Sequence, residues 1–365
     1  MSPPGGPTTA LVIGGTGPTG PHVVDGLLAR GMDVTVLNRG GRPVRFAGAV
    51  EQVVADPHVA ESLASALRHR SFDVVVATYG RLRLMPPILR ECTDRLVTVG
   101  GTAYAELPAG AAVEDSPRDL VHTIVRRMVE TEQTLSEAHA AGDFVHTHLR
   151  FPLLWGPGQI APKEWSIVRR VLDGRAFIPV VDGGRTLESK CFVTTAAAAV
   201  LLAVDRPGAS AGRTYNVADA ETPDDATRVR DLCAALGRPE VRLVNLPQTV
   251  HGPGGFWGVG RDLDAAVEGR PASTRHRLIS SDRIRDELGL RDVVPYAMAV
   301  DAVARHCTSW PLERGGEAES TLADAFDYAA EDRFAEELER FHARAAAIGF
   351  TPRGFRHQYD HPPTP

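Results

Sequence analysis

The stretch TALVIGGTGPTGPHVV, residues 9–24, decides the fold of this 365-residue chain. It opens with a short apolar, β-branched run that ends in glycine, a pattern typical of a buried parallel strand. Gly14, Gly17 and Gly20 follow with G-x-x-G-x-x-G spacing, and an apolar helical pattern comes next. In this context the glycines allow, in order, a tight turn, close approach of a pyrophosphate, and close packing of helix on strand. We therefore predict a dinucleotide-binding loop whose helix N-terminus faces phosphate.

Strand and helix patterns alternate along the first 155 residues. Further apolar stretches with strand character lie at 33–39, 52–57, 72–80, 94–101 and 144–158. Stretches with apolar residues at helical spacing lie at 22–31, 59–70 and 117–141. Strands that alternate with helices form a parallel sheet covered on both faces. We therefore predict an α/β fold: a Rossmann-type doubly wound parallel sheet.

Beyond residue 156 the pattern becomes mixed, which predicts a smaller mixed C-terminal substrate domain. The predicted division is 1–155 for the dinucleotide-binding domain, with a returning segment at about 190–217; 156–189 and 218–310 for the substrate domain; and 311–365 for a C-terminal helical extension and tail. The length of the chain suits this arrangement of a cofactor domain with a smaller partner.

The second predicted strand ends in Asn38 and Arg39. A dinucleotide domain that prefers NAD usually has Asp or Glu there, on the ribose diol. A guanidinium suits a 2′-phosphate and can stack on adenine, so the sequence favours NADP(H) over NAD(H). The alternative is that Arg39 is an ordinary surface cation. Asp56, after the third strand, either accepts from the adenine amino group or lies solvated in its loop.

The composition argues against several classes of partner. The net charge is −6 and there is no Lys/Arg-rich block, which disfavours nucleic acid and anionic membrane surfaces. We find no signal-peptide pattern and no apolar run long enough to span a bilayer. The four cysteines are far apart and lack metal-ligand spacing. We therefore expect reduced thiols in a cytoplasmic protein, without a metal site.

Four ordered motifs beyond the glycine loop resemble those of the extended short-chain dehydrogenases/reductases, the NAD-dependent epimerase/dehydratase family. They are LRFPLLWGPGQ (149–159), SKCFVTTAAAAVLLA (189–203), TYNVAD (214–219) and RLISSDRIRDELGL (277–290). The resemblance covers about residues 9–308, implies a Rossmann domain with a small substrate domain, and leaves a homodimer open. With the residues above, it gives the predicted cofactor-binding set: Gly14, Gly15, Thr16, Gly17, Pro18, Thr19, Gly20, Asn38, Arg39, Asp56, Thr78, Gly80, Phe151 and Pro152.

Enzymes of this family carry Tyr-x-x-x-Lys on the long helix after the fifth strand, and this chain lacks both residues. Glu114, Pro117 and Glu132 set a register that places Ile124 at the Tyr position and Met128 at the Lys position. Neither side chain can exchange a proton. The cofactor site is therefore predicted to be complete while the usual proton relay is absent.

Two further positions bear on this relay. A register shifted by two residues would place His122 and Arg126 there, but it fits the flanking residues less well. The Ser/Thr that precedes the helix in the family falls on Gly100, with Thr102 nearby. Either other residues carry the acid–base chemistry, or the protein binds the cofactor without standard turnover.

Tyr79 and Tyr104 follow the fourth and fifth strands, whose C-terminal ends face the ligand crevice. A phenol beside a cation could replace the missing relay, and Lys163, beyond the nicotinamide loop, is the candidate cation. These three are the catalytic candidates; a structural role for Tyr104 and an exposed position for Lys163 are the alternatives.

The predicted substrate-binding residues are Thr102, Lys163, Trp165 and Lys190. Lys190 matches a position where sugar-nucleotide relatives place a cation against phosphate. Trp165 and Trp257 could form a wall for a flat substrate, with core packing as the alternative. Trp257 lies in a glycine-rich stretch, 251–262, that predicts a flexible surface loop.

Three functions fit these patterns. The first is an NADP(H)-dependent oxidoreductase or isomerase of atypical mechanism acting on a small metabolite, for instance in secondary metabolism. The second is an NADP(H)-binding redox sensor or regulatory protein without standard turnover. The third is an RNA-binding relative, which the net charge and the lack of an aromatic-plus-basic pattern disfavour. We favour the first, because a pure sensor has less use for a complete substrate domain.

Overall fold

The computed structural model describes residues 8–105, 107, 109–160, 162–247, 276–322, 324–352, 354, 358 and 359. The glycine-rich stretch 251–262 and Trp257 lie outside these residues. The chain divides into two units, 1–325 and 326–365. The second unit contains the long helix α13 (Tyr328–Ala346).

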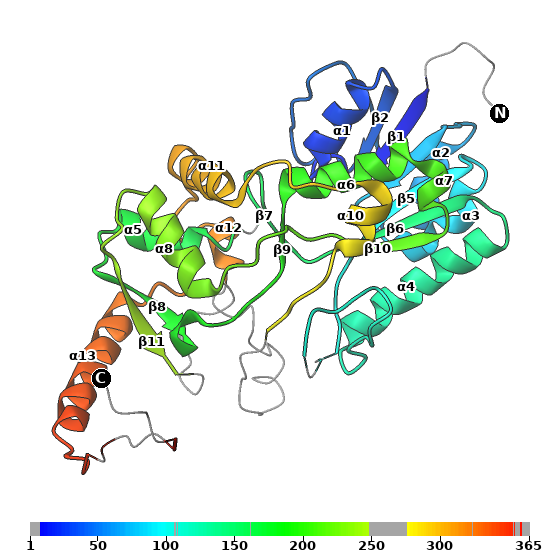
Figure 1. Cartoon of the computed structure of the whole chain (residues 1–365). Helices are drawn as coiled ribbons and strands as arrows, with labels where there is room; N and C mark the ends of the chain where they lie inside the picture. Colours follow the sequence, from blue (N-terminus) through cyan, green and yellow to red (C-terminus); the bar gives the residue numbers. More distant parts are fainter. Residues whose placement is uncertain are drawn as a thin grey trace, which may run out of the picture. The chain divides into compact units, whose positions relative to one another are not determined.

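A seven-stranded parallel sheet with the order β10-β6-β5-β4-β1-β2-β3 forms the larger lobe (Figure 1). Its strands are β1 (Thr9–Ile13), β2 (Asp33–Asn38), β3 (Glu51–Val54), β4 (Val74–Ala77), β5 (Arg95–Gly101), β6 (Val145–Phe151) and β10 (Arg213–Asn216). The central strands are buried, because helices cover both faces. This confirms the predicted α/β fold with a Rossmann-type sheet.

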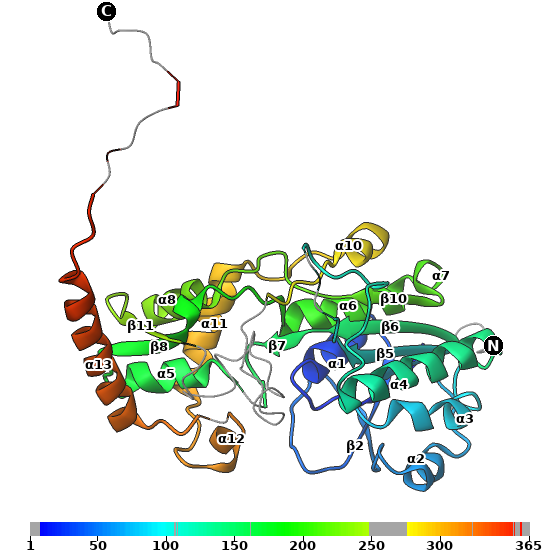
Figure 2. The same cartoon turned by 90° about the horizontal axis from the view of Figure 1, so that it is seen from below.

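Two apolar clusters fix the helices to the two faces of the sheet. One face carries α1 (Gly20–Leu28), α6 (Val193–Asp205) and α10 (Asp282–Leu288), with the short α7 (Pro207–Ser210) beside them. The other carries α2 (Ala60–Leu67), η1 (Leu82–Leu84), α3 (Pro86–Leu89) and α4 (Thr123–Ala140). Figure 2 shows α6 and α10 on one side of β6 and β10, with α4 on the other.

The smaller lobe contains helices and two short parallel strand pairs. Its helices are α5 (Trp165–Leu172), η2 (Asp182–Gly184), α8 (Asp225–Ala235), α11 (Tyr296–Ser309) and α12 (Glu317–Ser320). Its strand pairs are β8 (Phe177–Val181) with β11 (Arg242–Leu246), and β7 (Leu153–Trp155) with β9 (Lys190–Phe192). The sequence patterns did not predict β8, β11 or α11.

The long helix α4 begins at Thr123, whereas the pattern predicted a helix from residue 117. The reason is that Arg118 pairs with Tyr104 in an antiparallel bridge, which holds the preceding segment extended. Arg126 then closes the loop, because its guanidinium donates to the carbonyl oxygens of Leu120 and Val121. The first six residues of the predicted helix therefore connect the end of β5 to α4.

The segment 311–325 is fastened to α5 by buried polar contacts. Arg170 and Asp324 form a fully buried ion pair at 2.7 Å. Glu319 accepts from the indole N–H of Trp165 at 2.8 Å and pairs with Arg169 at 2.6 Å. This segment, for which the sequence offered no counterpart, is thus an integral part of the smaller lobe.

We predict that Asp324→Asn lowers the free energy of unfolding by about 3–5 kcal/mol, because it leaves the buried Arg170 guanidinium without its carboxylate. Urea denaturation followed by circular dichroism measures the change. Glu91→Gln is the matched control: its ion pair with Arg90 is exposed, so the loss should stay below about 1 kcal/mol. Equal losses in the two variants would contradict a structural role for the buried pair.

Candidate active site

The glycine loop between β1 and α1 has the tight geometry that the spacing predicts. Gly14 has a φ of +92°, and a Cβ there would lie 2.4 Å from Cβ of Tyr79. A Cβ on Gly20 would lie 2.3 Å from the carbonyl carbon of Gly15, so only glycine allows the helix to start there. A Cβ on Gly17 would meet only a carbonyl oxygen at 3.7 Å, which leaves that side of the loop open.

The loop also has main-chain donors for an anion. Among the described residues, the N–H groups of Thr16 and Thr19 make no hydrogen bond. Pro18 and Pro21 have no N–H, so this loop offers fewer donors than the motif allows. Thr78 holds the loop from β4, since its hydroxyl lies 3.3 Å from two loop carbonyl oxygens. The free N–H groups and the N-terminus of α1 suit a phosphate group.

Polar and aromatic side chains meet at the end of β2. Arg39 donates to the hydroxyl of Tyr79 at 3.3 Å, and its guanidinium lies 5.7 Å from the ring centroid. His58 packs edge-on against the same ring at 4.9 Å. The side chains of Asn38 and Asp56 are used locally, because each accepts from a main-chain N–H two residues later. The corner thus combines a cation with an exposed aromatic ring and has no acidic residue at the strand end.

This position changes the interpretation of Tyr79. Arg39 follows β2, which is three strands away from β5 in the sheet. Tyr79 is therefore a neighbour of the corner after β2. Its contacts with Arg39 suit an adenine ring or ribose better than proton exchange beside β5. The Phe151 ring is 5% exposed and packs in the core, so the predicted cofactor contact of this residue would have to come from its main chain. Pro152 is partly exposed, and Gly80, with a φ of +109°, forms the turn after β4.

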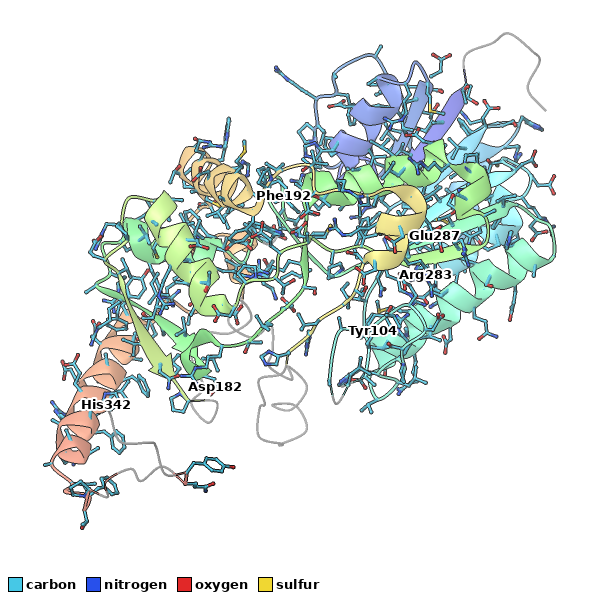
Figure 3. All side chains as sticks on the ribbon, in the orientation of Figure 1. Tyr104, Asp182, Phe192, Arg283, Glu287 and His342 are labelled. Carbon is cyan, nitrogen blue, oxygen red and sulfur yellow. The ribbon has the colours of Figure 1, made fainter. Side chains whose placement is uncertain are left out.

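A mostly buried cluster of polar side chains lies near β5, β6 and β10, towards the edge of the sheet opposite β2. It is centred on the carboxylate of Glu132, and we call it the Glu132 cluster: Glu132, Arg118, Arg150, His148, Tyr104 and Asn216. Glu132, on α4, lies 2.9 Å from a nitrogen of Arg118 and 2.6 Å from a nitrogen of Arg150. Arg150 donates to the hydroxyl of Tyr104 at 2.9 Å. Tyr104 in turn donates to Oδ1 of Asn216 at 2.5 Å. Figure 3 places Tyr104 near the start of α4.

Glu132 is ionised at neutral pH. Burial acts against its ionisation, but the neighbouring His148 and the hydrogen bonds and charge of Arg150 lower its pKa to about 2. Burial raises the pKa of Tyr104, and the nearby Arg150 and Arg118 only partly oppose this. Tyr104 is therefore a neutral phenol that can donate a proton and cannot act as a base.

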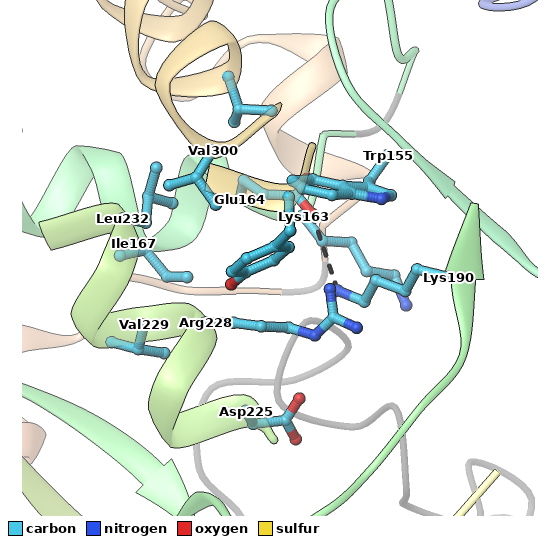
Figure 4. Close-up of a pocket in the computed structure, with 12 residues that line it drawn as sticks. Trp155, Lys163, Glu164, Ile167, Lys190, Asp225, Arg228, Val229, Leu232 and Val300 are labelled. Carbon is cyan, nitrogen blue, oxygen red and sulfur yellow. Dashed lines mark ion pairs between the residues drawn. The ribbon is translucent and has the colours of Figure 1, made fainter. Parts of the chain in front are cut away.

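Lys163 and Lys190 line a cavity of the smaller lobe (Figure 4). Burial lowers the pKa of Lys163, and its charged neighbours include Glu188 and Lys190. The cations stacked on the Tyr104 ring are instead Arg118 and Arg150. The predicted pairing of Lys163 with Tyr104 is therefore replaced by an arginine pair.

Trp165 and Thr102, two other residues predicted to bind substrate, make hydrogen bonds within the protein. Trp165 is only 2% exposed and its indole is bonded to Glu319, so the predicted aromatic wall is wrong for this residue. The indole that lines the cavity is that of Trp155. Thr102 is partly exposed, and its N–H donates to the carbonyl oxygen of Phe151 at 3.1 Å.

Solved structures of nucleotide-sugar enzymes share this architecture. UDP-glucose 4-epimerase from Thermus thermophilus, in complex with NAD, matches with a TM-score of 0.64 at 20% identity over 83% of this chain and 100% of that one. A dTDP-glucose 4,6-dehydratase from Streptomyces venezuelae, with NAD and TYD bound, matches with a TM-score of 0.64 at 20% identity over 84% of this chain and 98% of that one. The dTDP-glucose 4,6-dehydratase from Bacillus anthracis, in complex with NAD, matches with a TM-score of 0.65 at 13% identity over 83% of this chain and 97% of that one.

The chain has the epimerase/dehydratase fold of the extended short-chain dehydrogenases/reductases. Neither the family models nor the curated sequences give a match. The likeness is therefore one of structure.

The two positions predicted for the relay residues, 124 and 128, both lie on α4. Ile124 is 65% exposed on the first turn of α4. Met128 lies one turn later, and its Cε would be 2.5 Å from a Cβ on Gly101. Met128 thus packs on the end of β5, with Glu132 one turn further along the helix.

Sequence reasoning missed His148, a buried histidine that fills the space beside Gly100. A Cβ on Gly100 would lie 2.6 Å from Nε2 of His148, which is 2% exposed. Its Nδ1 is 2.7 Å from the Thr98 hydroxyl, which also lies 2.7 Å from Nε2 of His146. Nε2 of His148 makes no hydrogen bond in the described structure and is 3.6 Å from Glu132. The strand pattern indicates such a grouping, because residues 146, 148 and 150 lie on the same face of β6.

Within the described residues, no group of three or more His, Cys, Asp or Glu is arranged to hold a metal ion. The described helices include none with the length and apolar character needed to cross a membrane. The four cysteines are buried and free.

We predict that Glu132→Gln lowers the free energy of unfolding by about 3–5 kcal/mol, because two buried guanidinium groups lose their shared carboxylate. A carboxyl with a depressed pKa stabilises the folded state above its unfolded pKa and loses this effect as the pH falls towards its folded pKa. The wild-type advantage should therefore be complete above about pH 4.5 and fade towards pH 2.

Urea unfolding at a series of pH values measures this difference. Glu130→Gln, an exposed change on the same helix, is the control and should shift the free energy by less than about 0.5 kcal/mol. A Glu132→Gln variant whose deficit is the same at pH 2.5 and pH 7 would contradict the ionised-carboxylate account.

Proposed function

We propose that this protein binds NADP(H) and acts as an oxidoreductase or isomerase on a small metabolite, without the Tyr-x-x-x-Lys relay. The observation that carries the proposal is the β1–α1 loop with Arg39, in place of an acidic residue, at the end of β2. The open side at Gly17 and the free N–H groups of the loop support a pyrophosphate site. The Arg39–Tyr79 pair supports recognition of a 2′-phosphate and an adenine ring.

When bound, a nicotinamide ring supplies or accepts a hydride at a carbon of the substrate. The chain itself must then hold the substrate and exchange the proton at the reacting oxygen. The loop from residue 14 to residue 20 and Arg39 would bind the phosphates of the cofactor. The C-terminal ends of β5 and β6 would border the reacting end.

Tyr104 is the group in the Glu132 cluster best suited to donate that proton. Arg118 and Arg150 stay charged, Glu132 stays ionised, and His148 is buried beneath Gly100. The Tyr104 hydroxyl carries an exchangeable proton, now directed at Asn216. If it turned towards a substrate oxygen, Arg150 and Arg118 would stabilise the phenolate left behind.

The raised pKa of Tyr104 favours one direction of reaction. A neutral phenol can protonate a developing alkoxide, whereas proton abstraction requires the phenolate. The cluster therefore suits reduction of a carbonyl better than oxidation of an alcohol at neutral pH.

A second function rests on the same hydrogen bonds. Both the donor and an acceptor position of the Tyr104 hydroxyl are already used, by Asn216 and Arg150. If these bonds persist, Tyr104 is structural, and the apolar Ile124 and Met128 leave the helix without a proton donor. The protein would then be an NADP(H)-binding sensor, and tight cofactor binding without turnover would favour that function.

We predict that the protein binds NADP+ at least about ten-fold more tightly than NAD+, the range of one charge-assisted hydrogen bond to the 2′-phosphate. Arg39→Ala should remove most of this preference and leave NAD+ affinity within a few-fold. Isothermal titration calorimetry with both cofactors measures it. Arg45→Ala, an exposed arginine in the same loop, is the control and should keep the preference. Equal affinities in the wild type would refute the role of Arg39.

We predict that Tyr104→Phe lowers the rate of carbonyl reduction by about 10²–10⁴-fold, the usual contribution of a general acid, with NADPH affinity nearly unchanged. The rate is followed by NADPH absorbance on a substrate found by screening aldehydes and ketones. Tyr79→Phe is the control and should retain most of the rate while changing cofactor affinity. A Tyr104→Phe variant within a few-fold of wild type would assign the chemistry elsewhere.

A further inference from the structure

The cavity of the smaller lobe combines an apolar body with a charged end. Its apolar side chains come from three helices, α5, α8 and α11, and are Ile167, Val229, Leu232, Val300 and Val303. Two rings complete this part: Trp155, at the end of β7, and Tyr296, at the start of α11, with centroids 5.9 Å apart. In Figure 4 the aliphatic side chains of α5 and α8 lie at one side, and the charged groups at the other.

The charged end is lined by five side chains of both signs. They are Lys163, Glu164, Lys190, Asp225 and Arg228. Lys190 and Glu164 form an ion pair at 3.7 Å. Arg228 is fixed by main-chain carbonyls, to which it donates at 3.2 and 3.0 Å, and lies 6.0 Å from the ring centroid of Trp155. Three cations and two carboxylates leave one positive charge on the lining.

A third carboxyl stands beside this end of the cavity. Glu188 is 9% exposed, and its Oε2 has no hydrogen-bond partner in the described structure. Glu188 lies two residues before Lys190, the first residue of β9. Its main-chain carbonyl oxygen accepts a hydrogen bond from Arg228. Burial raises the pKa of Glu188 to about 7, so the net charge at this end is one positive charge while Glu188 is protonated and zero once it ionises.

We infer that this cavity binds an organic monoanion: one carboxylate on a compact aromatic or branched apolar body. One negative charge balances the lining, and the apolar body is buried against the three helices. A nucleoside diphosphate fits less well, because its two or more negative charges exceed the single positive charge available. Calling this monoanion the substrate rests on the proposed function; the binding itself does not.

Calorimetric titration of the full chain tests the inference with three monoanions, 3-phenylpropionate, indole-3-acetate and 4-methylpentanoate. At least one should bind saturably with one-to-one stoichiometry. For 3-phenylpropionate, the neutral 3-phenylpropionamide should bind at least about ten-fold more weakly, the factor for losing a charge-assisted hydrogen bond. UDP-glucose should bind more weakly than the best monoanion.

Two variants locate the site. Lys190→Met removes a lining cation and should weaken the best monoanion at least about ten-fold, the effect of one charge-assisted hydrogen bond. Arg238→Gln removes a cation paired with Glu240 beyond the C-terminal end of α8, outside the cavity lining, and should leave affinity unchanged. Circular dichroism confirms that each variant is folded, and a crystal structure with the bound monoanion gives its position even if Lys190→Met does not fold.

The inference is overturned if none of the three monoanions binds, if the amide binds as tightly as the acid, or if UDP-glucose binds most tightly. A bound position outside the cavity overturns it as well. Parallel titration with NADP+ separates this result from the proposed function. A protein that binds NADP+ and no monoanion contradicts only the cavity inference, and one that binds a monoanion and no dinucleotide contradicts only the proposed function.

Discussion

The ion pairs of Glu132 are the constraint on which the arrangement of α4, β6 and the segment after β5 depends. This single carboxylate joins α4 to β6 through Arg150 and to the segment after β5 through Arg118. Arg150 carries the connection onward to Tyr104, and Tyr104 to Asn216 on β10. Because both guanidinium groups are mostly buried, neither has water as an adequate replacement partner. The geometry around Tyr104 is therefore set by a charge network rather than by apolar packing.

Much of the fold could be predicted from the sequence, because its signals are local. The glycine spacing and the alternation of apolar runs each lie within a few residues, and they predicted the sheet and the glycine loop between β1 and α1. The Glu132 cluster could not be found this way. Its members come together through strand register, since Arg150 pairs with Gly100 on one side and Asn216 on the other. Short strands such as β8 and the buried indole of Trp165 likewise depend on distant partners.

The two lobes respond to acid in opposite directions. Glu132 stabilises the folded state at neutral pH, and that effect fades only towards pH 2. In the smaller lobe, burial raises the pKa of Glu188 to about 7 and of Asp225 and Asp219 to about 6. A carboxyl with a raised pKa contributes stability that is complete below its unfolded pKa, near 4, and is lost as the pH rises through its folded pKa. The smaller lobe thus carries buried acids at the cost of stability above pH 6, a pattern more common at binding sites than in structural cores.

The close contact between Gly100 and His148 leaves no space for a side chain at position 100. A serine at position 100 would place its Cβ 2.6 Å from the imidazole ring. The ring is buried and bonded to Thr98. A hydroxyl-bearing residue introduced at position 100 would therefore need a smaller residue at position 148 as well, and that second change would remove the contacts of His148 with Thr98 and Glu132.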